Sequence, residues 1–214
     1  MRDKIKDQQL TSLNEYIDTK SWDLADKLIK SWDVEKPIKE YNLAYLKFKQ
    51  GLEVDALMIL DHLKYSGMYS KDVRFANDEV KKSLDIYFIE ERLSPLDKIV
   101  LEAKLIPQDF FISGFLSLVI IGSIFLFLRK KIFGSLIISL SFIFLTSLYF
   151  LGQYELSYNL EEKVVFSGPS KIFEQIQVLP RGLKVIMTKE DADWRYIEYP
   201  KSFQGWIYQP KVSK

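Results

Sequence analysis

The sequence predicts a multi-domain membrane protein: an all-α region of helical hairpins, a two-helix transmembrane hairpin, and a small all-β barrel. Three observations predict this order. Residues 1–108 carry apolar residues at helical spacing, residues 110–152 contain two long uncharged apolar runs, and residues 163–208 form short β-rich runs separated by Gly and Pro. The chain has 214 residues, which is enough for one ordinary domain or two small ones.

The composition excludes several classes of function. The chain has 30 basic and 29 acidic residues, a net charge of +1, so no strong field attracts nucleic acid. It has no Cys and one His, which excludes disulfides, thiolate nucleophiles and sites with paired His or Cys ligands. No phosphate-binding loop, dinucleotide fingerprint or hydrolase motif occurs. We therefore expect no enzyme, no cofactor and no metal site.

Residues 1–108 are predicted to form a helical domain. Apolar residues recur three and four positions apart, which places them on one face of successive short helices. The stripes are Leu10, Leu13 and Ile17, then Trp22, Ala25, Leu28 and Ile29, then Leu43 and Leu46. Aromatic residues such as Tyr41 and Tyr45 accompany them. We expect most of these aromatic side chains to pack between helices, and only exposed ones could line a groove.

Part of this region resembles the tetratricopeptide repeat. The resemblance rests on small residues where two helices meet and on a glycine at their turn. Its residues are Tyr41, Leu43, Ala44, Gly51, Ala56 and Leu60. It implies a solenoid of helix pairs with a concave surface for protein partners. His62, on the helix that contains Leu60, is assigned no role because no second His or Cys is present to share a metal.

The two apolar runs predict transmembrane helices at 109–128 and 132–152. Residues 110–128 and 132–152 contain no charged residue, His, Asn or Gln. At about 1.5 Å per residue they extend roughly 28 and 31 Å, against a hydrocarbon core of about 30 Å. Small residues at helical spacing, such as Gly114 and Gly122, allow close packing within the hairpin or against another span.

A basic turn, residues 129–131, separates the two spans and predicts their orientation. Arg129, Lys130 and Lys131 should face the cytoplasm, which leaves both soluble domains outside it. However, residues 1–10 contain no apolar run that would serve as a secretory signal. The inverted orientation, with both domains in the cytoplasm, therefore stays open.

After a linker at 153–162, residues 163–214 are predicted to form the small barrel. Five short strands occur between turns such as Ser167–Ser170 and Pro180–Gly182, and a flat sheet of this size would leave edges exposed. The order of an apolar strand, a Ser-Gly-Pro-Ser loop, a Gly turn, a Trp-x-x-Ile strand and a closing Gly-Trp-Ile resembles the bacterial SH3-like (SH3b) domain.

Aromatic residues of this tail are candidates for a binding groove. An extended peptide or a glycan could lie on a platform of rings. The candidate residues are Trp194, Tyr196, Tyr199, Phe203, Trp206 and Tyr208. The alternative interpretation is that Trp194 and Trp206 belong to the core of the barrel. The SH3-like resemblance does not choose between wall-peptide binding and packing.

The order of the three parts resembles the BatE family of bacterial aerotolerance-associated proteins. This resemblance implies a protein of the inner (cytoplasmic) membrane that works with von Willebrand A-domain membrane partners and, indirectly, a MoxR-type ATPase. We therefore expect a membrane-anchored envelope scaffold in a Bat-type stress complex. The alternative is an envelope sensor or regulator that binds a peptidoglycan peptide.

Overall fold

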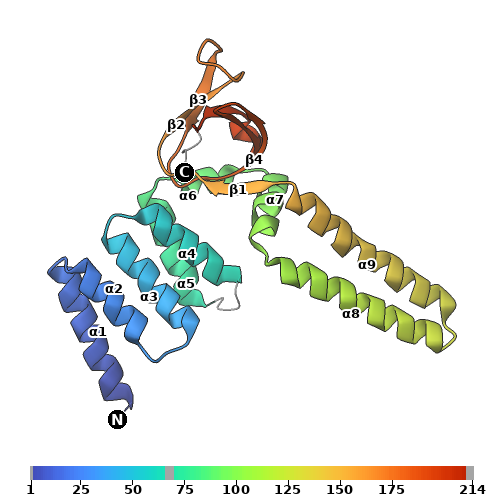
Figure 1. Cartoon of the computed structure of the whole chain (residues 1–214), viewed down its shortest axis with the longest axis horizontal. Coiled ribbons are helices and arrows are strands. Elements are labelled where there is room, and N and C mark those ends of the chain that lie inside the picture. Colours follow the sequence, from blue (N-terminus) through green and yellow to red (C-terminus); the bar gives the residue numbers. More distant parts are fainter. Residues whose placement is uncertain (1, 66–69, 211–214) are drawn as a thin grey trace. The chain divides into compact units, whose positions relative to one another are not determined.

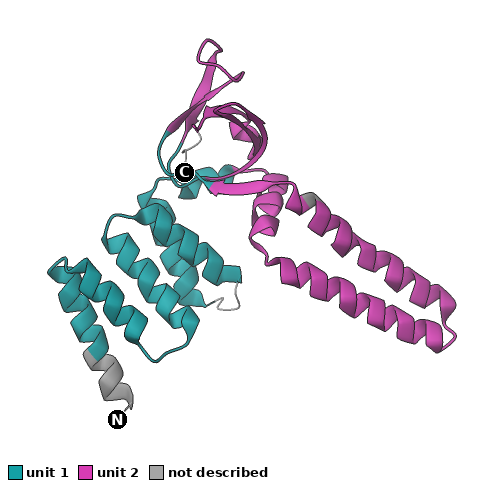
Figure 2. Cartoon of the chain, in the orientation of Figure 1, with its two compact units in different colours: residues 1–92, 158–162, 180–183 teal, residues 93–157, 163–179, 184–214 magenta. Residues whose placement is uncertain are grey.

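The computed structural model describes residues 2–65 and 70–210, with side chains for all of these except residues 2–8 and 150. The chain divides into two compact units, which Figure 2 shows in different colours. The first unit contains residues 1–92, 158–162 and 180–183. The second contains residues 93–157, 163–179 and 184–214. Both units therefore draw on segments that are far apart in the sequence.

The first unit is built from a row of helices in which neighbours in the sequence pack together (Figure 1). They are α1 (Arg2–Asp18), α2 (Trp22–Ser31), α3 (Lys36–Lys49), α4 (Glu53–Tyr65), α5 (Lys71–Ser83) and α6 (Tyr87–Arg92). Local signals set several ends. Pro37 lies in the first turn of α3, and the Ser70 hydroxyl accepts a hydrogen bond from Val73 N at the start of α5. The prediction of helices in this region is confirmed.

The apolar stripes of the first helices form a shared core. Leu13 of α1, Ala25 and Ile29 of α2, and Leu46 of α3 are buried together with Trp32. Their spacing of three and four residues puts each set on one helix face, and each face is covered by the next helix. Burial of apolar surface against a neighbour therefore stabilises this row of short helices, which would be marginal in isolation.

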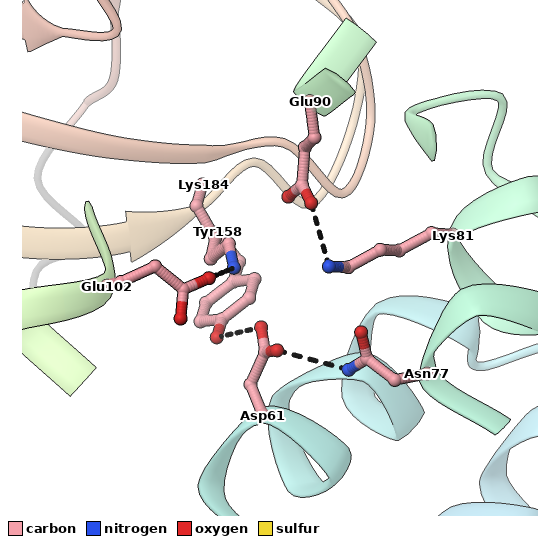
Figure 3. A network of polar contacts seen from close by, with 7 residues as sticks. All are labelled: Asp61, Asn77, Lys81, Glu90, Glu102, Tyr158 and Lys184. Atoms are coloured by element: carbon pink, nitrogen blue, oxygen red, sulfur yellow. Dashed lines mark hydrogen bonds and ion pairs between the residues drawn. The ribbon is translucent and has the colours of Figure 1, made fainter. Parts of the chain in front are cut away.

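A buried polar cluster joins α4 and α5 to the segment 158–162. The Asp61 carboxylate is fully buried, and it accepts hydrogen bonds from Asn77 Nδ2 at 3.1 Å and from the Tyr158 hydroxyl at 2.8 Å (Figure 3). Buried polar groups are stable only when they are hydrogen-bonded, so this carboxylate helps to fix the positions of Asn77 and Tyr158. Nearby, Lys81 Nζ pairs with Glu90 at 2.7 Å.

The segments 158–162 and 180–183 are held together by hydrogen bonds around Asn159. Its side-chain amide donates to Pro180 O at 3.0 Å, and its backbone carbonyl accepts from Gly182 N at 2.6 Å. Arg181 pairs with Glu53 of α4 at 3.3 Å. Gly182 has a φ of +83° and packs on Leu84, where a Cβ atom would approach a methyl carbon to 2.7 Å. The backbone angle favours glycine here, and a Cβ atom would also force the Leu84 side chain to move.

The second unit contains the apolar hairpin, formed by α8 (Gln108–Phe127) and α9 (Lys131–Gly152). Both helices are long and apolar enough to cross a membrane. Close packing uses the small residues within the hairpin: a Cβ at Gly122 would lie 2.6 Å from Ile138 Cγ1 and 3.0 Å from the carbonyl oxygen of Gly134. Of the two uses predicted for these small residues, the structure shows packing inside the hairpin.

Helix α7 (Pro95–Leu105) belongs to the second unit, although the sequence placed it in the helical domain 1–108. Leu93 and Leu101 pack with Ile186 of the sheet. The buried Asp97 carboxylate accepts hydrogen bonds from the Ser94 hydroxyl at 2.8 Å and from Lys201 N at 3.1 Å. Glu102 and the buried Lys184 form an ion pair at 3.8 Å (Figure 3). These contacts fix α7 to the sheet.

The tail forms one six-stranded sheet with the order β1-β4-β5-β6-β2-β3, in which the pairs β2–β3, β2–β6, β4–β5 and β5–β6 are antiparallel. The strands are β1 (Glu155–Tyr158), β2 (Lys163–Phe166), β3 (Gln175–Leu179), β4 (Lys184–Asp191), β5 (Trp194–Tyr199) and β6 (Gly205–Tyr208), with a 3₁₀ turn at Lys201–Phe203. The core side carries Val165, Ile197 and Ile207, all buried.

This sheet corrects the prediction of a closed barrel. The strand order leaves β1 and β3 as the two ends of an open sheet. Register shifts at Ile186–Lys189 of β4 and at Val165–Phe166 of β2 increase the local twist without closing the sheet. The range 153–162, predicted as a linker, contributes β1, which covers the outer edge of β4. The β-rich character of the tail is confirmed.

Candidate functional site

The first candidate site is a groove between α3 and α5 in the first unit. It has a volume of about 210 Å³ and is lined by Tyr41, Ala44, Tyr45, Phe48, Lys49, Leu60, Phe75, Ala76, Glu79 and Val80. Tyr41, Ala44, Tyr45 and Phe48 lie at i, i+3, i+4 and i+7 and therefore share one face of α3. The buried Ala44 and Leu60 are part of its lining, and the small side chain of Ala44 leaves room above it.

Exposed aromatic rings give this groove its character. Phe75 is 63% exposed and Tyr45 is 40% exposed, and Lys49 Nζ lies 5.3 Å from the centre of the Tyr45 ring. The volume is below the roughly 300–1,000 Å³ of pockets that hold drug-sized ligands. A hollow of this size, rimmed by exposed rings, suits one or two anchoring side chains of a protein partner.

Phe75 is one of the groove residues that the sequence did not assign to a site. The buried positions of α5 are Val73, Asn77, Val80 and Lys81, which lie on one side of the helix. Phe75 lies off this stripe, and a large aromatic residue on the polar side of a helix is the signal that could have identified it. Phe48, Lys49 and Glu79 carried no comparable signal.

The alkaline stability of the first unit should depend on Tyr41. Burial raises the pKa of this phenol above its usual 10.0, and the nearby Asp72, Glu79 and Tyr45 raise it further. The folded unit then binds the proton more tightly than the unfolded chain, so its stability is unaffected below pH 10 and falls as the pH rises from there through the raised pKa. Tyr41→Phe should remove this part of the loss in unfolding experiments on the full chain at increasing pH. Tyr16→Phe, on α1 of the same unit, is the control, because Tyr16 is not among the groups that raise the pKa of Tyr41. Identical alkaline profiles for both variants would contradict this assignment.

The second candidate site is a row of aromatic rings on β5 and β6. The strand register places Trp194 opposite Tyr208 and Tyr196 opposite Trp206. The rings of both pairs make edge contacts, with centroids 5.5 and 5.2 Å apart. Trp194 and Trp206 are half-buried, and they alternate along their strands with the buried Ile197 and Ile207. The row therefore lies on the face opposite Ile197 and Ile207, where the Trp194 ring also contacts the buried Phe166, with centroids 5.4 Å apart.

Lysine side chains accompany this aromatic row. Lys171 Nζ lies 5.1 Å from the centre of the Tyr208 ring, and Lys189 Nζ lies 5.3 Å from that of Tyr196. Such cation–π contacts orient the lysines over the rings. The structure does not bring the other two predicted groove residues to this row. Tyr199 contacts Tyr154 and the core beneath α7, and Phe203 lies in the 3₁₀ turn.

The residues that resemble the tetratricopeptide repeat have distinct positions. Ala44, Ala56 and Leu60 are buried, and Leu43 packs against the core that contains Leu46. Gly51 has a φ of +76° in the turn between α3 and α4, a backbone angle that favours glycine. Tyr41 lines the groove. The small residues thus lie where the sequence placed them, at the junction of two helices.

The basic residues of the hairpin turn are exposed. Arg129 has a φ of +62°, and its backbone N–H donates to Leu126 O at 3.0 Å, which ends α8. Lys131 is already the first residue of α9, so the turn is one residue earlier than predicted. Arg129, Lys130 and Lys131 together place three cations at one end of the two apolar helices.

Within residues 2–65 and 70–210, no group of three or more His, Asp or Glu side chains is arranged to hold a metal ion. No protein-family model, curated protein or solved structure matches the chain.

Proposed function

We propose that this chain is a membrane-anchored scaffold of the cell envelope that binds a protein partner in the groove between α3 and α5. The observation that carries this proposal is the exposure of Phe75 and Tyr45 beside a hollow of about 210 Å³. Exposed aromatic anchors around a small pocket are typical of protein–protein hot spots. The apolar hairpin would hold this groove at a membrane, where it meets membrane-bound partners at a high effective concentration.

The finer identity of the parts belongs to the same proposal. We propose that α3 and α4 form a tetratricopeptide-like pair, that the tail is an open SH3-like domain, and that the chain is a BatE-like component of a Bat-type complex. Its partners would then be von Willebrand A-domain membrane proteins. The buried Ala44 and Ala56 and the positive φ of Gly51 support the first part. The basic turn supports a cytoplasmic bend with both domains outside.

A photoreactive phenylalanine analogue at Phe75 tests the proposal in intact membranes. The analogue should capture a protein partner from Phe75, and the same analogue at Phe88 should not. Phe88 is a matched control because it is 65% exposed on α6 and does not line the groove. With the captured partner purified, Tyr45→Ala should weaken binding at least about fivefold, because removal of an interface anchor costs roughly 1 kcal/mol or more.

The control and the binding measurement together decide the outcome. Phe75 and Tyr45 are both exposed, so their replacement leaves the helix core intact. Equal capture from Phe75 and Phe88, or an unchanged affinity of Tyr45→Ala for the partner, would contradict binding in this groove.

A second function is favoured by the aromatic row of the sheet. Trp194, Tyr196, Trp206 and Tyr208 lie outside the sheet core and offer ring faces and edges to an extended ligand. We propose as the alternative that this row binds a cell-wall peptide or glycan in an envelope sensor. Co-sedimentation of the full chain with isolated peptidoglycan, and its loss in Trp206→Ala, separates this function from the scaffold.

A further inference from the structure

An apolar groove lies in the second unit where α7 meets the end of the hairpin opposite the basic turn. Its volume is about 410 Å³, within the range of pockets that bind small molecules. Val100 and Ala103 of α7 form one wall, and Phe111 of α8 with Ile143 and Ser147 of α9 form the other. Tyr199 of the sheet closes one end. Most of the lining is therefore supplied by the two apolar helices and by the helix that leads into them.

The residues between α8 and α9 explain why the hairpin is open at this end. Near the turn, Gly122 and Gly134 allow the two backbones to approach closely. Toward α7, phenylalanine rings lie between the helices, with the Phe115 and Phe142 centroids 6.0 Å apart. Figure 1 shows α8 and α9 diverging toward α7. Glycines bring α8 and α9 close together near the turn, whereas the larger phenylalanine side chains keep them apart toward α7. A space therefore remains beneath α7.

A hydrogen bond fixes the wall that α7 provides. Lys104 Nζ of α7 donates to Leu151 O in the last turn of α9 at 2.6 Å. A cation at the carboxyl end of a helix also interacts favourably with the helix dipole. Burial lowers the pKa of Lys104, as expected for an ammonium group partly removed from water. This contact ties α7, which forms one wall of the groove, to α9, which contributes to the other.

We propose that this groove binds one acyl chain of a bilayer glycerophospholipid; the inference rests on the membrane placement in the proposed function. The lining continues the exposed apolar surface of the hairpin, which includes Phe110 and Ile143. Thr146, also in the lining, uses its hydroxyl to donate to Phe142 O within its own helix, so that polar group is already satisfied. An apolar space that opens toward the bilayer core is filled by the hydrocarbon around it.

Exposed residues of α7 support the same occupant. Leu96 and Ile99 lie three residues apart, are exposed, and extend the apolar surface from the hairpin onto α7. The opposite face of α7, with Asp97 and Leu101, is buried against the sheet. Helix α7 therefore has one face for the sheet and one for an apolar environment, as in helices that lie at a membrane surface.

A photoreactive lipid tests this site in the full chain. The protein is reconstituted in vesicles that contain a phosphatidylglycerol with a diazirine in the middle of one acyl chain, and labelled residues are mapped by mass spectrometry. We expect label on Val100 or Ala103 of α7 as well as on α9. Ala103→Phe and Ser147→Phe, which fill the groove from opposite walls, should each lower the α7 label at least about fivefold, because a packed groove excludes the chain.

The control variant is Leu140→Phe, which enlarges an exposed position of α9 that does not line the groove and should leave the α7 label unchanged. Label confined to α8 and α9 would overturn lipid binding in the groove while leaving the membrane placement intact. Label on α7 that both groove variants leave unchanged would overturn lipid binding in the groove too. So would the finding that the transmembrane helix of a partner protein crosslinks to Ala103 and abolishes the α7 label, because a protein would then occupy the groove. A chain that stays in the aqueous fraction without any label would contradict the proposed function itself.

Discussion

A single cysteine at Lys131 should be protected from a membrane-impermeant maleimide in intact cells, and cysteines at Ser31 and Ser202 should react. The chain contains no natural cysteine, so each variant has one reactive position. All three positions are exposed in the structure. Translocation of the three cations of the turn is costly, roughly 2.5–3.5 kcal/mol for each Lys or Arg at the membrane centre. The turn should therefore stay in the cytoplasm and become reactive only after permeabilisation.

Neutralising the turn is the control for this expected result. Replacing Arg129, Lys130 and Lys131 by Gln removes the charge bias and should give a mixture of orientations, with partial labelling of Ser31Cys and Ser202Cys. Labelling only at Lys131 would demonstrate the inverted orientation. Different accessibility of the cysteines at Ser31 and Ser202 would contradict a two-span hairpin, because the two positions precede and follow both helices.

Replacing Asp61 by Ala should destabilise the first unit by about 3 kcal/mol, since each buried donor left without an acceptor costs roughly 1–3 kcal/mol. The donors to Asp61 include the buried Asn77 Nδ2 and the half-buried Tyr158 hydroxyl. Amide hydrogen exchange of α4 and α5 in the full chain measures the effect. A change of this size should accelerate exchange from the folded state about a hundredfold, at about 1.4 kcal/mol for each factor of ten.

Two further variants separate the hydrogen bonds from the helix itself. Asp55→Ala makes the same substitution at an exposed position of α4 and should change exchange only slightly. Tyr158→Phe removes one hydrogen-bond donor and should lower the stability of the first unit less than Asp61→Ala does. Its effect on exchange should extend to residues 158–162. If Asp55→Ala and Asp61→Ala accelerate exchange equally, the buried cluster does not stabilise the unit.

The apolar hairpin and the helical region were the most predictable parts of the chain. Residues 110–128 and 132–152 are apolar throughout, and no tertiary contact is needed to recognise such runs. The stripe of Ala25 and Ile29 likewise predicts its buried helix face because the repeat of 3.6 residues is a local property. The short strands of the tail were also recognisable. Whether their sheet closes into a barrel was not, because closure depends on which strand edges pair in the folded protein.

The aromatic residues show where local pattern is insufficient. Trp194, Tyr196 and Tyr199 belong to one short strand, and the sequence assigned all three to one groove. The strand alternation and the pairing with β6 place Trp194 and Tyr196 in the aromatic row, whereas Tyr199 points into the core beneath α7. The position of Phe75 off the buried stripe of α5 is a local signal, but its place beside Tyr41 and Tyr45 in one groove depends on how α3 and α5 pack on α4.

The sequence alone determined the properties that depend on neighbours along the chain. These are the helical and β-rich regions, the two apolar runs, the basic turn between them, and the absence of Cys-dependent chemistry. The tertiary structure alone decided which segments pack together. It assigned α7 to the sheet and residues 158–162 and 180–183 to the helical unit. The physical reason is that single buried contacts, such as Asp61 with Tyr158 across 97 positions of the chain, have no periodic signature in the sequence.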